Sequence, residues 1–255
     1  MIDLHLSTIG ADAAALAREH GFGIEIAEFS YAANMDADFP RWDTVTRENL
    51  EGIQRRVFHA PFNELCPAAI DPLVAELTRK RLEQAYQLTR RYGIRRMVVH
   101  SGYIPHLYVH SYFTERSVQF WRDFLLDKPA DFSLLLENTL EEGPDMLRDI
   151  VEKTGDPRLQ LCLDLGHAGG HFSDLPVSRW IETFAPYLAH VHIHNNYRTG
   201  DLHNPPGDGL IDIQAALAAI TELRPGATYT AETAELRKAA AWLESRGFLN
   251  QKITG

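Results

Sequence analysis

The stretch FSLLLENTLEEGPDMLRDIVEKTGDPRLQLCLDLGH, residues 132–167, contains one complete strand–helix–strand repeat. Its two short apolar runs, 132–137 and 159–165, predict buried strands. The amphipathic stretch 144–154 between them predicts a helix. Two buried strands joined through a helix are typical of a parallel sheet in which a crossover helix follows every strand.

The same alternation continues to both ends of the chain, with no low-complexity tract or linker to divide it. We expect six further strands, at 1–6, 23–29, 56–59, 96–100, 189–194 and 227–232. We expect seven further helices, at 11–20, 44–53, 72–92, 115–126, 177–184, 213–223 and 234–246. Eight strands that alternate with eight helices in 255 residues predict a (β/α)8 TIM barrel.

An open doubly wound sheet would alternate in the same way, but the turn after the first strand disfavours it. That turn reads LSTIGADA, residues 6–13, and lacks the glycine-rich fingerprint of a dinucleotide-binding fold. We therefore predict a single α/β barrel domain over residues 1–255. In such a barrel the functional residues lie at the C-terminal ends of the strands.

The composition disfavours several classes of function. The chain has 25 Lys and Arg against 35 Asp and Glu, a formal charge of −10, which argues against a general polyanion-binding surface. Its two cysteines, Cys66 and Cys162, make neither a disulfide framework nor a four-cysteine zinc site. No apolar run reaches the ~20 residues of a membrane span, and the N-terminus lacks the basic start of a signal peptide. We expect a cytoplasmic protein with no membrane partner.

Histidines and carboxylates gather at the ends of six successive predicted strands. Four carboxylates that converge in a barrel mouth would repel one another unless cations neutralise them. Imidazole and carboxylate ligands together suit Zn²⁺ or Mn²⁺. We therefore predict a divalent-metal site at the C-terminal ends of the strands. The nine candidate ligands are His59, His100, Glu137, Asp164, His167, His194, Asp201, His203 and Glu232.

Other polar and aromatic residues have a structural interpretation beside the functional one. We interpret the remaining histidines as structural, namely His5, His20, His106, His110, His171, His190 and His192. His192 is the first of these to reconsider, because it precedes His194 by two residues and lies on the same strand face. Tyr103 and Arg198 follow predicted strand ends and are candidate substrate contacts. Tyr103 could instead pack within its loop, and Arg198 could be solvated.

The order of these motifs resembles the xylose isomerase-like TIM barrel superfamily. This superfamily contains sugar isomerases and epimerases and the endonuclease IV-type apurinic/apyrimidinic endonucleases. The resemblance covers nearly the whole chain, from GIEIAEF at 23–29 to AET at 231–233. Between them lie HAPFNELCPAAIDP (59–72), VVHSGY (98–103), ENT (137–139), CLDLGH (162–167), HVHIHNN (190–196) and DLHNPPGDGLID (201–212).

In the isomerase and epimerase branch, the resemblance implies one metal ion, often Mn²⁺, held by Glu137, Asp164, His194 and Glu232. The two glutamates would also serve as acid and base on opposite faces of the substrate carbon. His167 would contact a substrate oxygen. A metal beside a ketose carbonyl acidifies the neighbouring C–H bond and stabilises the enediolate that forms.

In the endonuclease IV branch, the resemblance implies three Zn²⁺ ions held by all nine residues. Glu137 would bridge two of the ions, and the reaction would be hydrolysis of a phosphodiester. The chain retains the Asp201/His203 pair that one-metal epimerases generally lack. Against a nuclease, the chain is short for that branch and has no loop rich in the basic and aromatic residues that extrude a nucleotide.

We therefore expect a divalent-metal-dependent isomerase or epimerase of a small sugar or sugar phosphate. Glu137 and Glu232 would be its acid/base pair, with one to three Zn or Mn ions per chain. The alternative is a Zn-dependent phosphodiester hydrolase of the endonuclease IV kind, so nucleic acid stays a disfavoured partner. A metal-binding barrel without turnover is the third interpretation. We expect a monomer or a homodimer.

Overall fold

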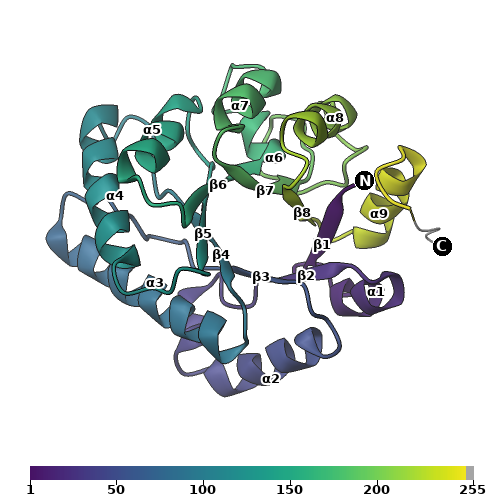
Figure 1. Cartoon of the computed structure of the whole chain (residues 1–255), viewed down its shortest axis with the longest axis horizontal. Coiled ribbons are helices and arrows are strands. Elements are labelled where there is room, and N and C mark those ends of the chain that lie inside the picture. Colours follow the sequence, from purple (N-terminus) through teal and green to yellow (C-terminus); the bar gives the residue numbers. More distant parts are fainter. Residues whose placement is uncertain (251–255) are drawn as a thin grey trace.

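Eight parallel strands form a closed barrel at the centre of the molecule, and helices lie around it (Figure 1). The computed structural model describes residues 1–250. The strands are β1 (Asp3–Ser7), β2 (Gly23–Ile26), β3 (Arg56–His59), β4 (Arg96–His100), β5 (Ser133–Glu137), β6 (Leu159–Asp164), β7 (Leu188–Ile193) and β8 (Thr228–Ala231). Each strand pairs in parallel with the next, and β1 pairs with β8, which confirms the predicted barrel. Residues 251–255, the end of the predicted domain, lie outside the described residues.

The connections between the strands run through helices on the outside of the barrel (Figure 1). They are α1 (Ala13–His20), the 3₁₀ helix η1 (Ala32–Met35), α2 (Phe39–Leu50), α3 (Pro72–Arg91), α4 (His110–Leu125), α5 (Asp145–Thr154), α6 (Leu165–Ala168), α7 (Val177–Phe184), α8 (Ile213–Leu223) and α9 (Leu236–Ser245). Pro72 opens α3, where the sequence predicts the helix to start, and the Asp71 side chain caps it by accepting a hydrogen bond from Leu73 N at 2.9 Å. The sequence does not predict η1 and α6, because a single turn leaves no periodic apolar pattern.

Helices α2 and α4 begin earlier than the sequence predicts. The prediction started them at residues 44 and 115, whereas they begin at Phe39 and His110. Pro40 lies in the first turn of α2 and is a start signal in its own right. The first turn of α4 buries Phe113, so part of the aromatic segment after β4 belongs to the packing face of the helix.

The inside of the barrel has an apolar side and a polar side. From β3 to β6, Val57, Val98, Leu135 and Cys162 form a buried apolar cluster. The strands that complete the ring contribute buried polar side chains, namely Glu25 from β2, His190 and His192 from β7, and Thr230 from β8. A column of polar groups therefore lies beneath the strand ends where the candidate ligands gather.

An irregularity in β7 determines which of its residues lie level with the end of β6. Leu161 pairs with Leu188 but Cys162 pairs with His190, so β7 contains one extra residue, Ala189. Beyond it, Asp164 pairs with His192. His192 therefore lies at the level of Asp164, the last residue of β6.

The cysteines are as the composition predicts, since Cys66 and Cys162 are both free and buried. Burial raises the pKa of both thiols, that of Cys162 to about 12, and such thiols are unreactive at neutral pH. Within residues 1–250, no helix combines the length and the apolar character that a bilayer crossing requires.

Candidate active site

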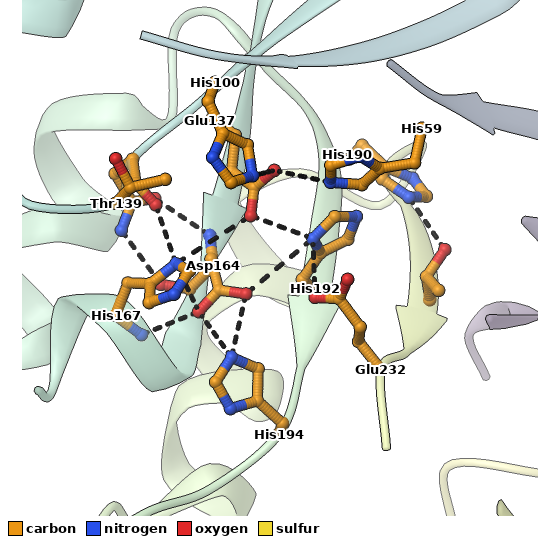
Figure 2. Close-up of polar contacts among 12 residues, drawn as sticks. His59, His100, Glu137, Thr139, Asp164, His167, His190, His192, His194 and Glu232 are labelled. Carbon is orange, nitrogen blue, oxygen red and sulfur yellow. Dashed lines mark hydrogen bonds and ion pairs between the residues drawn. The ribbon is translucent and has the colours of Figure 1, made fainter. Parts of the chain in front are cut away.

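Four side chains from consecutive strands converge at the C-terminal end of the barrel (Figure 2). They are Glu137 from β5, Asp164 from β6, His192 from β7 and Glu232 directly after β8, and we call them the deep group. His192 Nδ1 lies 3.1 Å from Glu137 Oε1, 3.1 Å from Glu232 Oε2 and 3.7 Å from Asp164 Oδ2. All four are buried, and Glu232 is the most accessible, at 7%.

Glu137 also contacts two histidines outside the deep group. Its Oε2 lies 3.4 Å from His59 Nε2 at the end of β3 and 3.4 Å from His100 Nε2 at the end of β4. This oxygen is buried, and no hydrogen-bond donor reaches it in the described part of the chain. The two oxygens of Glu137 therefore face two different sets of potential ligands.

Four more residues form a set beside the deep group, and we call them the shallow group: His167, His194, Asp201 and His203. His167 Nε2 lies 3.4 Å from Asp201 Oδ2, and His203 Nε2 lies 3.1 Å from Asp201 Oδ1. The rings of His194 and His203 stack with their centroids 4.0 Å apart. His194 Nε2 also lies 2.9 Å from Asp164 Oδ1, which connects the two groups.

Local turns bring the shallow group together. Asp164 caps α6 by accepting a hydrogen bond from His167 N at 2.6 Å. Gly166 is required in this turn, because a Cβ there would collide with the ring of His194. His203 has a φ of 48°, which is uncommon for a residue other than glycine, and its Nδ1 lies 2.9 Å from Glu232 O.

The separations between these side chains suit a bound divalent cation. Two ligands that each lie about 2.1 Å from one ion are about 3.0–3.4 Å apart, close to many of the distances above. The ligand atoms lie within 4.8 Å of one another in each of three sets. These sets are the deep group, the shallow group, and His59 with His100 and Glu137. The buried Glu137 Oε2, which lacks a donor, also fits a cation at this place.

The structure groups one predicted ligand differently from the sequence. The sequence interpretation placed His194 with Glu137, Asp164 and Glu232, and it treated His192 as structural. The register of β7 instead places His192 among these carboxylates, while His194 lies in the shallow group. The physical reason is the register of β7 against β6, which pairs His192 with Asp164 and leaves His194 two residues further on, beyond the end of the strand.

The charges in the mouth depend on one another. Burial opposes ionisation of Glu137, but His192 and His100 beside it hold its pKa well below the usual range. Burial also opposes protonation of His192, yet the acidic side chains around it raise its pKa well above the usual value. Burial lowers the pKa of His100 to about 4. A cation bound at the deep group would take the place of the proton on His192.

A cavity of about 380 Å³ opens at the barrel mouth, large enough for a small molecule. Glu137, Glu232 and His203 line it together with the aromatic rings of Phe62 and Tyr31. Polar groups that can bind a cation or move a proton thus share one cavity with apolar faces. A small polar molecule with a carbon skeleton matches this lining.

The three predicted substrate contacts differ in where the structure places them. His167 lines the mouth cavity. Tyr103 is buried, with its hydroxyl 2.9 Å from His110 Nε2, and it lines an adjoining cavity of about 420 Å³ that also reaches His167. Arg198 lies away from both cavities, because its guanidinium donates to Ser173 O at 2.9 Å and pairs with Asp174. The role of Arg198 as a substrate contact stays a prediction, and neither of these two cavities supports it.

Two residues that face the site were missed as functional candidates, His192 and Glu25. Glu25 lies in β2 and is fully buried, with Oε1 3.1 Å from His192 Nε2. The segment GIEI contained a usable signal, since a carboxylate between isoleucines in a buried strand requires a polar partner. The partner itself could not be read from the sequence.

A family model described as the xylose isomerase-like TIM barrel matches residues 10–252. The chain belongs to this family. The match spans all of β2 to β8 and every residue of the deep and shallow groups. The match to the family model therefore includes the residues of the barrel mouth as well as those that form the barrel.

Individual relatives of this xylose isomerase-like chain are distant. It is 26% identical over 197 residues to the uncharacterized protein MJ1311 of Methanocaldococcus jannaschii. The match covers 72% of this chain and 66% of MJ1311, so it spans slightly less than two thirds of the length of MJ1311. The structure of the TTHB071 protein from Thermus thermophilus, soaked with ZnCl₂, is similar with a TM-score of 0.76 and 24% identity, over 98% of this chain and 100% of that one. A D-tagatose 3-epimerase-like protein is similar with a TM-score of 0.75 and 22% identity, over 96% and 97%. These likenesses establish the fold.

Proposed function

We propose that this xylose isomerase-like barrel is a divalent-metal-dependent isomerase or epimerase of a small sugar or sugar phosphate. The observation that carries the proposal is the deep group, in which Glu137 Oε1 and Glu232 Oε2 each lie 3.1 Å from His192 Nδ1. Three carboxylates and one imidazole would hold the ion, a donor set that suits Mn²⁺ or Zn²⁺. The similarity to a D-tagatose 3-epimerase-like protein supports the substrate class.

The deep group would hold Zn²⁺ or Mn²⁺, and the positive charge would polarise the carbonyl and the neighbouring hydroxyl of a keto sugar and make the adjacent C–H bond more acidic. Side chains then move the protons. Glu137 comes from β5 and Glu232 follows β8, so the two carboxylates approach a substrate in the mouth from different sides. One removes the proton from carbon, and the other returns a proton to the opposite face or to the neighbouring carbon.

Each of these carboxylates has one oxygen that faces His192 and a second oxygen that would carry the proton. Glu137 Oε1 and Glu232 Oε2 face His192, which leaves Glu137 Oε2 and Glu232 Oε1. Their position in a water-poor pocket strengthens the electrostatic interactions that the reaction uses. Glu137 Oε2 lies 3.4 Å from His59 Nε2 and His100 Nε2, so it would move a proton beside these two rings.

The remaining walls of the cavity would orient the substrate. His167 and His203 line one part of the cavity and would hydrogen-bond sugar hydroxyls. Phe62 and Tyr31 line another part, where an aromatic face packs against the C–H groups of a sugar ring or chain. Holding the reacting carbon near a carboxylate speeds the reaction, because it fixes the geometry of proton transfer.

Exchange with solvent tests this proposal. Protein loaded with Zn²⁺ or Mn²⁺ and incubated in D₂O with a panel of ketoses and ketose phosphates should introduce deuterium beside the carbonyl of one of them. The same preparation after chelation should introduce none, and the Glu232→Gln variant is the matched control for the side-chain role. Absence of exchange with every member of the panel, in protein shown to contain metal, would contradict the proposal.

The shallow group favours a second candidate function, the hydrolysis of a phosphodiester. Together with the other two sets it could hold up to three ions, and a multinuclear site stabilises both the attacking and the leaving oxygen of an in-line displacement. Nicking of an abasic DNA duplex by the zinc-loaded protein, without deuterium exchange into any ketose, would establish hydrolysis instead.

A further inference from the structure

Glu25 lies on the opposite side of the His192 ring from the deep carboxylates. Its Oε1 is 3.1 Å from His192 Nε2, whereas Nδ1 of the same ring faces Glu137 and Glu232. Oε1 and Nε2 are both buried, and within residues 1–250 neither has a hydrogen-bond partner, so each is the nearest polar group available to the other. His192 is therefore held between an acid below it and the candidate metal site above it, and Figure 2 shows its ring among the carboxylates of that site.

The second oxygen of Glu25 is fixed by β7 and β8. Oε2 accepts a hydrogen bond from Thr230 Oγ1 at 2.6 Å and lies 3.2 Å from His190 Nε2. The other nitrogen of His190 lies 2.6 Å from Thr228 Oγ1, which anchors that ring as well. The Glu25 carboxylate is thus held by partners on two other strands, and its free oxygen points at His192.

We propose that Glu25 is a positioning residue that aims Nδ1 of His192 at the bound cation. The inference rests on the proposed metal site. A histidine that binds metal through one ring nitrogen carries a proton on the other, and an acceptor for that proton fixes the ring and strengthens it as a ligand. Glu25 Oε1, 3.1 Å from His192 Nε2, would be that acceptor. The same contact gives the buried carboxylate the partner that it needs to be tolerated in the barrel.

Three variants separate this role from simple packing. Glu25→Leu removes the acceptor but keeps an apolar side chain of similar length. Glu25→Gln keeps an oxygen that can accept from His192 Nε2 and gains an amide that can donate to Thr230 Oγ1. The matched control is Thr230→Val, which removes the hydrogen bond to Oε2 and leaves Oε1 in place. For each, zinc affinity is measured by competition with a chelator, and metal-free stability by urea unfolding.

The inference predicts a graded loss of zinc affinity. Glu25→Leu should weaken binding about 10–100-fold, the range for partners of metal-bound histidines, with Glu25→Gln recovering part of that loss and Thr230→Val losing less than about threefold. Unchanged affinity in Glu25→Leu would overturn the inference. An equal loss in Thr230→Val would also overturn it, by assigning the effect to packing. So would a Glu25→Gln variant that recovers none of the lost affinity.

The zinc-loaded wild-type protein gives a second readout, which stands even where Glu25→Leu fails to fold. In ¹H–¹⁵N spectra of the histidine rings, the Nε2–H of His192 should lie far downfield and exchange slowly with solvent, because it is buried and donated to a carboxylate. A rapidly exchanging Nε2–H would overturn the inference. Wild-type protein that binds no zinc refutes the proposed function and this inference together. Wild-type affinity in all Glu25 variants refutes this inference alone.

Discussion

The deep group and the shallow group contain the same kinds of side chain but are built on different parts of the barrel. The deep group comes from four strand ends and is buried. In the shallow group, His167 lies on the one-turn helix α6 and the other three follow β7, with the Asp201 side chain 52% exposed. Strand ends are fixed by the hydrogen-bond register of the barrel, whereas loop residues are free to move. The deep group is therefore the better pre-organised of the two sites.

The two groups also differ in charge. The deep group has three carboxylates and one histidine, and the shallow group has one carboxylate and three histidines. A divalent cation is attracted more strongly by the larger negative charge, which is also the more buried and so the less screened by water. We therefore expect a tightly held ion at the deep group and weaker, additional binding at the shallow group.

The largest effect is expected from Glu232→Gln. The substitution keeps the shape of the side chain and removes the charge that carries a proton, so turnover should fall by about 10²–10⁴-fold. Initial rates with the ketose identified by deuterium exchange provide the measurement. A variant with more than a tenth of the wild-type rate would show that the acid/base pair has been assigned to the wrong residue.

A pair of histidine variants tests which residue belongs to the tight site. His192→Ala removes a ligand of the deep group and should weaken the tightest zinc binding strongly. The loss should exceed the range of about 10–100-fold that is typical when a hydrogen-bond partner of a metal-bound histidine is removed. His194→Ala removes a shallow ligand two residues away and should change that affinity by less than about tenfold. Chelator competition with both variants compares them directly. The opposite order of effects would reinstate the assignment made from the sequence.

His203→Ala should act on metal content more than on rate. The side chain contacts Asp201 and stacks on His194, so its loss should remove at most the weaker ion and leave the tight one in place. Elemental analysis of protein purified without chelator should show a decrease of no more than one ion per chain. Loss of the tight ion as well would mean that the two groups bind metal as one unit.

The smallest effect on metal is expected from Asp43→Asn, on the outside of the barrel. Hydrogen bonds from Arg91 hold the pKa of Asp43 well below its usual value, with Tyr92 and Arg47 adding to the effect. Because the pKa of Asp43 is lower in the folded than in the unfolded protein, its ionised carboxylate stabilises the fold above pH ~4. This stabilisation is lost as the pH falls toward and through the pKa of Asp43 in the folded protein. The variant should lose about 1 kcal/mol at pH 7, since Arg91 is largely solvated, and less in acid.

Urea unfolding at pH 7 and pH 3 measures this loss, and zinc affinity should equal that of the wild type. A destabilisation that is larger at pH 3 than at pH 7 would contradict the assigned direction of the shift. A change in zinc affinity would contradict the expectation that only charges in the mouth control the metal site.

Most of the fold could be predicted from the sequence because each buried strand carries its own signal. The apolar runs at 56–59 and 96–100 coincide with β3 and β4, and the amphipathic stretches at 177–184 and 213–223 coincide with α7 and α8. All nine predicted ligands lie in the three sets that the structure brings together. Strand ends of a barrel share one mouth, so knowing where strands end is enough to place those residues near one another.

The details that could not be predicted depend on geometry between strands and loops. The grouping of His192 rather than His194 with the deep carboxylates follows from the register of β7 against β6, which neighbouring sequence does not encode. The partner of Arg198 could not be predicted because a loop arginine has many possible partners, and here it pairs with Asp174. The role of Glu25 depends on contacts to β7 and β8, more than 160 residues away in the chain.

Locating the first zinc ion to bind shows whether the deep group is the tighter metal site. Crystals grown with substoichiometric zinc, measured at the zinc absorption edge, show by anomalous difference density which residues bind the tightest ion. The account predicts density among Glu137, Asp164, His192 and Glu232, with none at the shallow group until more zinc is added. Density that appears first between His167, Asp201 and His203 would contradict it.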